Sequence, residues 1–284
     1  MREGLPSGTS FLVSFARGLG VDDQVVDPIA ADLLPRWLGR MADAPRRLRN
    51  TGALYRKAVR ATTFGLVDHM VLRTQAIDAH LGSALRSGIA QVVILGAGLD
   101  ARAWRLPALE SRTVFEVDHP ATQRYKRRRI GGRTPRADLR YVTVDFEKDR
   151  FATELQRTGF RPDEPSFWIW EGVVMYLPLD VIDETLAQLT SLAAAGSELA
   201  MTYRVPGMLP FGALGHAAIP FLFRAAGEPL KATLAPDELA TALSPGWDVV
   251  YDDDAHGWHE LGGSLAKPSN SFLAERLAVA KRRG

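Results

Sequence analysis

Short, continuous runs of apolar residues recur through the middle of the chain and constrain its fold more than any other feature. Runs this short, bounded by turn residues, are typical of strands buried on both faces of a parallel sheet. The stretches between them are long enough for crossover helices, so strands and helices alternate. The sequence therefore predicts an α/β fold with a mostly parallel sheet, whose first five strands are residues 91–95, 113–117, 139–144, 166–170 and 197–203.

Helical patterns dominate the N-terminal side of this alternation. Apolar residues three and four apart predict mainly helix over residues 9–87, including helices over 53–69 and 72–85. A further helix is expected after the fourth strand, beginning at Pro178 and ending at Gly196. Proline favours the first turn of a helix and glycine its end, so both bounds have a physical reason.

Residues 205–234 interrupt the alternation and are rich in Gly, Pro and Phe. This composition predicts a helical insertion packed over a site, or else an ordinary apolar loop and helix of the core. After it, residues 236–243 predict a helix, and 247–251 and 272–280 predict closing strands, of which the second could also be helical. A single domain is expected, with an N-terminal helical cover (1–87), a core (88–204), a substrate-side insertion (205–234) and a closing helix and strands (235–284).

The composition excludes several classes of protein. Hydrophobic residues make up 46% of the chain and charged residues 24%, which is ordinary for a globular protein with a core. There is no cysteine, so a disulfide framework, a cysteine nucleophile and a thiolate metal site are excluded. No apolar run is long enough to span a membrane, and the apolar stretch near the N-terminus has no cleavage site. We therefore expect a cytoplasmic protein with no membrane partner.

The charge is nearly balanced, at +2, but residues 124–136 contain seven Lys or Arg and no acid. One interpretation is a phosphate-binding patch. The favoured one is a solvated helix end whose cations suit the helix dipole. One basic cluster on a balanced chain does not indicate nucleic-acid binding, so no nucleic-acid partner is expected.

A glycine turn and three acids follow the predicted strands. The turn is Gly96-Ala97-Gly98 after the first strand, and the acids are Asp118, Asp145 and Glu171 after the second, third and fourth. Ligands of open α/β sheets bind outside the carboxyl ends of the strands, and glycine allows a ligand to approach the backbone closely. An acid after the second strand can accept both ribose hydroxyls of a nucleoside. The array therefore indicates a nucleoside-binding site.

A nicotinamide enzyme is one alternative, because residues 96–101 fit the G-x-G-x-x-G/A pattern with Ala101 in the last place. In that case Glu116 or Asp118 would hold the ribose. Two features count against it. Asp100 puts a carboxylate at the helix start, where a pyrophosphate would bind, and this alternative does not explain Asp145 and Glu171 together.

The chain resembles the leucine carboxyl methyltransferase-like family, in particular its bacterial branch of O-methyltransferases of secondary metabolism. The resemblance is carried by LRTQAIDAHL, VVILGAGLDARAWRL, VFEVDHP, YVTVDFEKD and WEGVVMYLP, which run in the family order from about residue 72 to 178. It implies a Rossmann-like class I methyltransferase sheet with S-adenosyl-L-methionine as the cofactor.

The resemblance also implies a role for each matching residue. Arg73 would grip the cofactor carboxylate, and Gly96 and Gly98 would form the glycine turn. Asp118 would bind the ribose, and Glu171 would lie near the amino-acid end of the cofactor. Asp145 and Phe146 would flank the adenine.

The substrate side is less defined by the sequence. Residues after Tyr203 match no known pattern, and Ala101 and Trp104 replace the family's usual Thr or Ser and Tyr. O-methylation of a small molecule is the favoured activity. The alternatives are C- or N-methylation and a cofactor-binding domain without catalysis.

No catalytic residue is identified beyond the candidate Tyr203. The six histidines are expected to be structural, and His256-x-x-His259 alone is too little for a metal site, so no metal is predicted. Methyl transfer gains from a closed pocket that excludes water, so residues 9–40 and 205–234 are expected to cover the site and move. The oligomeric state is not predicted.

Overall fold

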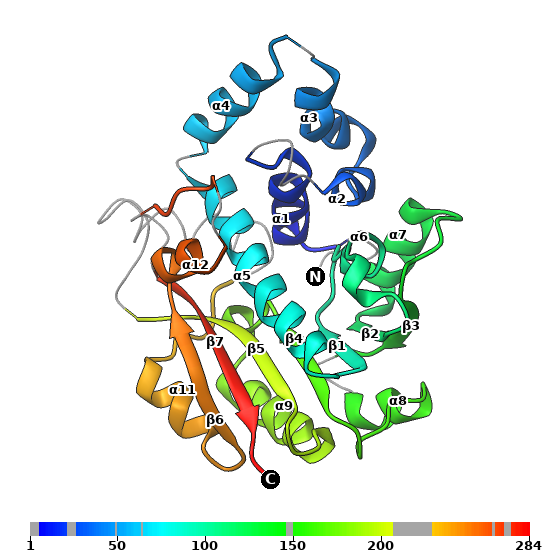
Figure 1. Cartoon of the computed structure of the whole chain (residues 1–284), viewed down its shortest axis with the longest axis vertical. Coiled ribbons are helices and arrows are strands. Elements are labelled where there is room, and N and C mark those ends of the chain that lie inside the picture. The colour runs from blue at the N-terminus through cyan, green and yellow to red at the C-terminus, as the bar shows by residue number, and fades with distance from the viewer. Residues whose placement is uncertain are drawn as a thin grey trace.

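The strands form one mostly parallel sheet in the computed structural model, which describes residues 6–21, 27–48, 50–63, 65–145, 150–206, 229–262, 265–269 and 274–284. Within these residues the sheet has seven strands in the order β3-β2-β1-β4-β5-β7-β6 (Figure 1). Neighbours pair in parallel except at β7, which is antiparallel to both β5 and β6. This arrangement confirms the predicted Rossmann-like class I sheet. The strands are β1 (Gln91–Leu95), β2 (Thr113–Asp118), β3 (Asp138–Thr143), β4 (Ser166–Trp170), β5 (Glu198–Arg204), β6 (Trp247–Asp253) and β7 (Glu275–Arg282).

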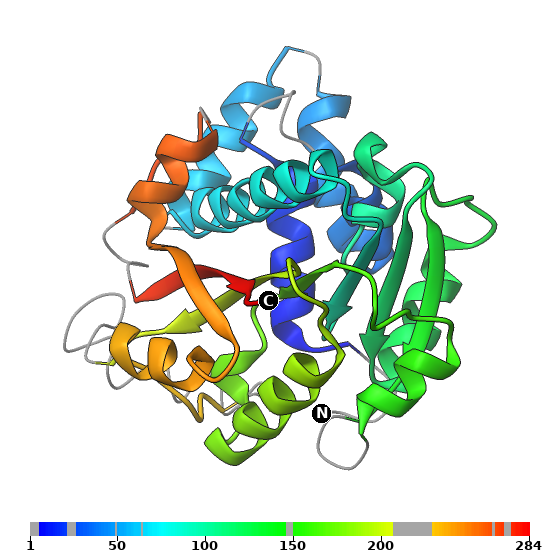
Figure 2. The same ribbon diagram turned by 60° about the horizontal axis from the view of Figure 1, so that its bottom comes forward.

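Side chains from the two faces of the sheet enter two separate hydrophobic cores. On β1, Val92 and Ile94 belong to one core, while Val93 and Leu95 belong to the other. This alternation is what a strand covered on both faces requires, and it explains why the strand is apolar throughout. Helix α5 (Leu66–Arg86) contributes to the first core and α9 (Leu179–Leu192) to the second. Figure 2 shows these two helices on opposite sides of the sheet.

Four N-terminal helices, called the N-terminal cover from here on, pack on one another and on α5. Helix α1 packs against α2, α3 and α5, and its Arg17 bonds to the backbone of Leu99 in the loop after β1. The cover consists of α1 (Gly8–Leu19), α2 (Pro28–Leu33), α3 (Arg36–Arg47) and α4 (Gly52–Thr62). Among the described residues the other helices are α6 (Arg102–Arg105), α7 (Pro120–Ile130), α8 (Phe151–Arg157), α11 (Pro236–Leu243) and α12 (Ala255–Gly262), with short 3₁₀ helices at Pro107–Leu109 and Val174–Tyr176.

Two helix predictions had the wrong bounds. The break expected between residues 69 and 72 lies at Gly65 instead, whose φ of 87° is accessible mainly to glycine, and α5 then runs unbroken to Arg86. The helix expected to end at Gly196 ends at Leu192, and Gly196 lies in the turn before β5. The ambiguous C-terminal segment is a strand, β7.

Some sequence predictions fall outside the described residues. Most of the insertion predicted over 205–234 does so, since residues 207–228 are not described. Among the helices that are described, none combines the length and the apolar character needed to cross a bilayer.

The basic segment 124–136 is occupied largely by structural contacts. Lys126 is buried and bonds to Glu116 at 2.6 Å. Arg129 donates to the backbone carbonyls of Asp32 and Leu34, at 2.7 Å for the first, and Arg133 pairs with Asp32 at 2.6 Å. The contacts of Arg129 and Arg133 join the end of α7 to α2, which supports the interpretation as a helix end.

Candidate functional site

The glycine turn links β1 to α6 and cannot tolerate side chains. Gly96 and Gly98 have φ values of 64° and 52°. A Cβ on Gly96 would lie 2.5 Å from Cγ2 of Val173, and one on Gly98 would lie 2.9 Å from Oγ of Ser10. The turn is therefore held between α1 and the loop after β4, and its bare backbone permits close approach by a ligand.

Asp118 ends β2 directly beside this turn. One carboxylate oxygen accepts the backbone N–H of Gly98, and the other accepts that of His119 at 2.6 Å. Burial raises the pKa of Asp118, while these two N–H groups and the ammonium of Lys126 oppose that rise. Each carboxylate oxygen retains accepting capacity, so the group can accept two further hydroxyl donors.

The end of β3 lies next to Asp118. The backbone N–H of Val144 donates to the carbonyl oxygen of Asp118 at 3.0 Å, which places Asp145 close to the end of β2. Asp145 is half-buried. Phe146, the other residue predicted to flank the adenine, lies outside the described residues.

Glu171 and Arg73 are brought into direct contact from β4 and α5. Nε of Arg73 donates to Oε1 of Glu171 at 3.0 Å, and Nη1 of Arg102 donates to Oε2 at 2.9 Å. All three side chains are buried or nearly so. Burial alone would raise the pKa of Glu171, but Arg102 and Arg73 outweigh it and lower that pKa. Glu171 is therefore an ionised carboxylate inside the protein.

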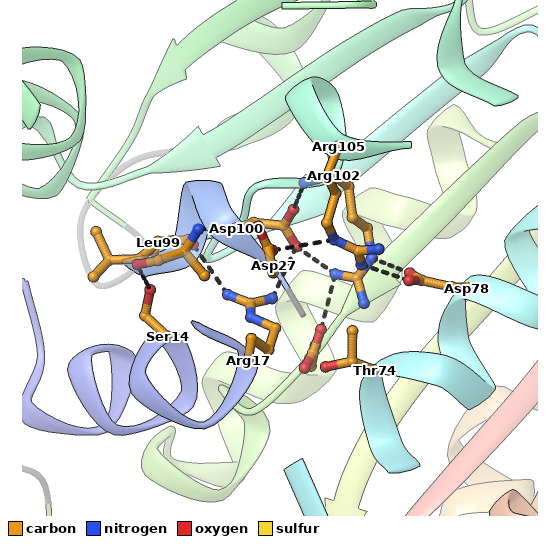
Figure 3. Close-up of polar contacts among 12 residues, drawn as sticks. Ser14, Arg17, Asp27, Thr74, Asp78, Leu99, Asp100, Arg102 and Arg105 are labelled. Atoms are coloured by element: carbon orange, nitrogen blue, oxygen red, sulfur yellow. Dashed lines mark hydrogen bonds and ion pairs between the residues drawn. The ribbon is translucent and has the colours of Figure 1, made fainter. Parts of the chain in front are cut away.

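Sequence reasoning missed Arg102 as the centre of this charge cluster. Its side chain is fully buried and bonds to Asp78 at 2.6 Å and to Asp100 (Figure 3). It also bonds to Glu171. Burial alone would lower the pKa of Arg102, but the carboxylates raise it well above its usual range. Its Nη2 has no hydrogen-bond partner among the described residues. A buried arginine surrounded by carboxylates is fixed in both position and charge.

The N-terminal cover is tied to the same cluster. Arg17 of α1 donates to the carbonyl oxygen of Leu99 at 3.0 Å, and its Nη1 lies 4.0 Å from Oδ2 of Asp100. Arg105 pairs with Asp78, and its Nε lies 3.2 Å from Asp27 at the start of α2 (Figure 3). The turn after β1 and the helices above it therefore share one set of ion pairs.

A second carboxylate on Arg73 comes from the C-terminal strand. Nη1 of Arg73 donates to Oε1 of Glu275 at 2.8 Å, and Nε2 of His69 lies 2.7 Å from Oε2 of the same residue. Burial alone would raise the pKa of Glu275, but Arg73 and His69 lower it to about 2. Arg73 is thus held between two ionised carboxylates, from β7 and from the end of β4.

The structure places Tyr203 in a different set of contacts. Its hydroxyl donates to Oδ2 of Asp252 at 2.7 Å, and Arg276 donates to Oδ1 of the same residue at 2.9 Å. Burial and Asp252 raise the pKa of Tyr203. The side chain is fully buried, so its hydroxyl serves to join β5 to β6.

Besides His69, two of the described histidines contact structural neighbours. Nδ1 of His119 accepts the backbone N–H of Ala121 at 3.2 Å and so caps α7. The rings of His80 and Tyr251 lie 4.8 Å apart. Across the described ranges, no three His, Asp or Glu side chains are grouped so that they could hold a metal ion.

The sheet order and the residues at its strand ends define the class: a Rossmann-like α/β protein of the class I methyltransferase type. The chain belongs to the leucine carboxyl methyltransferase family, whose model matches residues 13–190. This match confirms the resemblance inferred from the motifs.

Relatives by sequence are predicted S-adenosyl-L-methionine-dependent methyltransferases. One from Mycobacteroides abscessus is 35% identical over 193 residues, covering 66% of this chain and 63% of the relative. One from Mycobacterium marinum is 36% identical over 210 residues, covering 68% of this chain and 64% of the relative. The chain thus spans less than two thirds of the length of either relative.

Two solved structures share the fold across almost the whole chain. One is a predicted methyltransferase from Thermobifida fusca YX, with a TM-score of 0.63, 16% identity, and coverage of 100% of this chain and 97% of that one. The other is a DUF574 family protein from Streptomyces avermitilis MA-4680, with a TM-score of 0.62, 16% identity and 98% coverage of both chains.

Proposed function

We propose that the protein is an S-adenosyl-L-methionine-dependent methyltransferase that methylates an oxygen atom of a small molecule. The observation that carries the proposal is the carboxylate of Asp118 at the end of β2, bonded to the backbone of Gly98 in the turn after β1. In an open α/β sheet this is where the ribose of a nucleoside is held. The family match covers both residues.

The donors and acceptors around this point fit the chemistry of S-adenosyl-L-methionine. Asp118 would accept the ribose hydroxyls, and the Gly96–Gly98 backbone would lie against the cofactor. Asp145 and Phe146 would flank the adenine. Arg73 would hold the carboxylate of the cofactor and Glu171 its ammonium. The carboxylate and ammonium of an amino acid lie close together and require a cation and an anion that do so too, as Arg73 and Glu171 do at 3.0 Å.

The bound cofactor would supply an activated methyl group on a sulfonium. The protein's own task is to align the acceptor and to exclude water. A carboxylate acceptor needs no base, whereas a hydroxyl often benefits from one. Tyr203 remains the candidate for orienting the substrate, although its hydroxyl would have to leave Asp252 to do so.

A nicotinamide cofactor fits the turn less well. Oδ1 of Asp100 accepts the backbone N–H of Arg102 at 2.7 Å, so a carboxylate already occupies the start of α6. A pyrophosphate would need that same position and would be repelled. The contact supports the preference for S-adenosyl-L-methionine over a dinucleotide.

Oxygen is favoured as the acceptor atom because the family is named for a carboxyl methyltransferase. C- or N-methylation uses the same cofactor residues and is the second candidate. A role in secondary metabolism and a cytoplasmic location are part of the proposal, and both rest on the sequence alone.

Calorimetry tests the cofactor. S-adenosyl-L-methionine and its demethylated product should both bind, and NAD should not. Asp118→Ala removes two charge-assisted hydrogen bonds, each worth roughly 1.5–3 kcal/mol, so affinity should fall at least about tenfold. Asp118→Asn should lose less, and Asp163→Ala, which changes an exposed acid, should lose nothing. Binding of NAD alone, or an Asp118→Ala protein that binds as well as wild type, would refute the proposal.

Label transfer tests the acceptor atom. Methyl-labelled cofactor is incubated with candidate small molecules, and the product is treated with alkali. A carboxyl methyl ester releases its label as methanol, whereas methyl groups on ether oxygen, carbon or nitrogen stay attached. Alkali-stable label is then located by NMR of the product, and label on carbon or nitrogen would exclude O-methylation while leaving the cofactor assignment intact.

A further inference from the structure

Exposed apolar side chains gather on α3 and α4. Trp37 and Leu54 are 66% and 68% exposed, and Met41 and Leu48 are 44% and 43% exposed. Trp37 and Met41 are four residues apart and lie on one face of α3, and Leu48 directly follows the last residue of that helix. Together with Leu54 of α4, these side chains are called the apolar stripe. Ala42 and Pro45 are the buried residues of α3.

Cations border this stripe. Arg36, Arg40 and Arg47 have the same spacing and form a neighbouring row on the exposed side of α3, and Lys57 is exposed on α4. No acid among the described residues forms an ion pair with Arg36, Arg40 or Lys57, whereas Arg47 pairs with Asp43 at 2.5 Å. The apolar stripe therefore lies beside a row of positive charge.

The charge is concentrated in this part of the chain. Residues 36–60 contain eight Lys or Arg and one acid, although the net charge of the whole chain is only +2. The remainder of the chain is therefore net acidic. Both helices lie at one end of the molecule, away from the closing strands β6 and β7 (Figures 1 and 2).

We propose that the exposed faces of α3 and α4 bind the surface of an anionic lipid bilayer. A helix that places Trp and aliphatic side chains beside arginines suits the boundary between headgroups and acyl chains. The arginines would meet anionic headgroups, while the apolar stripe enters the layer beneath them. Peripheral binding needs no membrane-spanning helix, and it revises the expectation that the protein has no membrane partner.

A bilayer suits these faces better than the other occupants. A nucleic acid would match the arginines but would leave Met41, Leu48 and Leu54 against water or phosphate. A second copy of the chain would bring one row of cations against another. The inference is independent of methyl transfer, because it rests only on this surface.

The fluorescence of Trp37 offers a direct test. Of the six tryptophans, Trp37 is 66% exposed and the other five are at most 7% exposed. Adding phosphatidylglycerol vesicles should shift the emission to shorter wavelength and protect the exposed component from acrylamide. Phosphatidylcholine vesicles should do neither, and Trp37→Phe should abolish both effects.

Vesicle co-sedimentation tests the role of charge. Arg36→Gln with Arg40→Gln should weaken binding to phosphatidylglycerol vesicles about 25-fold, at about fivefold for each arginine near the surface. The matched control, Arg157→Gln with Arg161→Gln, changes two exposed arginines of another region and should bind as wild type. Raising the salt concentration should weaken wild-type binding. Circular dichroism and thermal unfolding establish that each variant is folded.

Four results would overturn the proposal. They are the absence of an emission shift with anionic vesicles, equal binding to neutral vesicles, unchanged binding of the Arg36/Arg40 variant, and an equal shift of Trp37 with duplex DNA. A dimer in light scattering whose Trp37 is already shielded from acrylamide without lipid would assign the surface to a second copy instead.

Discussion

Replacing Arg102 with leucine should be among the most destabilising single changes in this chain. The side chain is fully buried and bonds to three carboxylates, those of Asp78, Asp100 and Glu171. Removing one partner of a buried ion pair typically costs 3–5 kcal/mol, because the other charge is left uncompensated. With three carboxylates affected, we expect a loss at the upper end, about 5 kcal/mol. For a chain of this size that lowers Tm by roughly 8–10 °C.

The loss in the free energy of unfolding caused by Arg102→Leu should be larger at high pH than at low pH. In wild type, burial would raise the pKa of Asp100, but Arg102 and Arg17 hold it well below its usual range. The stability that this lowered pKa provides is fully present above the pKa that Asp100 has in the unfolded chain. It is lost only in strong acid, as the pH falls through the lowered pKa of the folded protein. In Arg102→Leu the pKa of Asp100 should rise, because its main cation is gone while its burial remains. The variant should therefore lose stability as pH rises, and its cost should be larger at pH 8 than at pH 5.

Urea unfolding of both proteins at pH 5 and pH 8 measures this difference. Arg157→Gln is the control, since Arg157 forms an exposed ion pair with Glu154 and should change stability by less than about 1 kcal/mol. A cost for Arg102→Leu below 1 kcal/mol, or a cost equal at the two pH values, would show that the cluster does not depend on this arginine.

Three further predictions concern the turn, the C-terminal strand and the cover. Gly96→Ala should lower the free energy of unfolding more than Gly196→Ala. Both positions have a positive φ, which costs an alanine about 1–2 kcal/mol, but only at Gly96 would the added Cβ also meet a neighbouring side chain. Equal Tm losses in the two variants would contradict this. Glu275→Gln should cost about 3 kcal/mol at pH 7, since it leaves Arg73 with one carboxylate fewer. Because the pKa of Glu275 is lowered to about 2, that cost should shrink in urea unfolding as pH falls from 4.5 toward 2, and a cost that does not vary with pH would argue against the ion pair. Residues 9–40 and 205–234 should gain protection from hydrogen exchange when the demethylated cofactor and a substrate bind, while the central strands change little. Equal protection with and without ligands would indicate a rigid, preformed pocket.

The strands were predictable because each is marked locally. Val92 to Leu95 are apolar on both faces, and Gly96 or an acid ends each of the early strands. The break before α5 was not marked in this way. Helix α4 ends at Thr62, and Gly65 precedes α5 as its N-cap in a left-handed conformation, whereas the predicted break at residues 70–71 contains no residue that strongly disfavours helix. The segment of β7 was ambiguous because its apolar residues fit both periods.

The candidate site was predictable only in part. Residues at strand ends could be assigned because the edge of a parallel sheet gathers them, as Asp118 shows. The partners of Arg73 and Arg102 could not, since Glu275 lies 202 residues from Arg73, and Glu171 lies 69 residues from Arg102. Such contacts depend on the strand order and on which helix faces which strand, and no local pattern encodes them.

The position of β7 sets the order in which this protein can be completed during synthesis. It lies between β5 and β6 although both precede it in the chain. Until residues 275–282 have left the ribosome, β5 and β6 each present an unpaired edge, which is a template for aggregation. Arg73 also lacks its second carboxylate at that stage. A chain interrupted before Glu275 should therefore be retained by chaperones or degraded, and a pulse of labelled synthesis should yield protease-resistant protein only after β7 has been made.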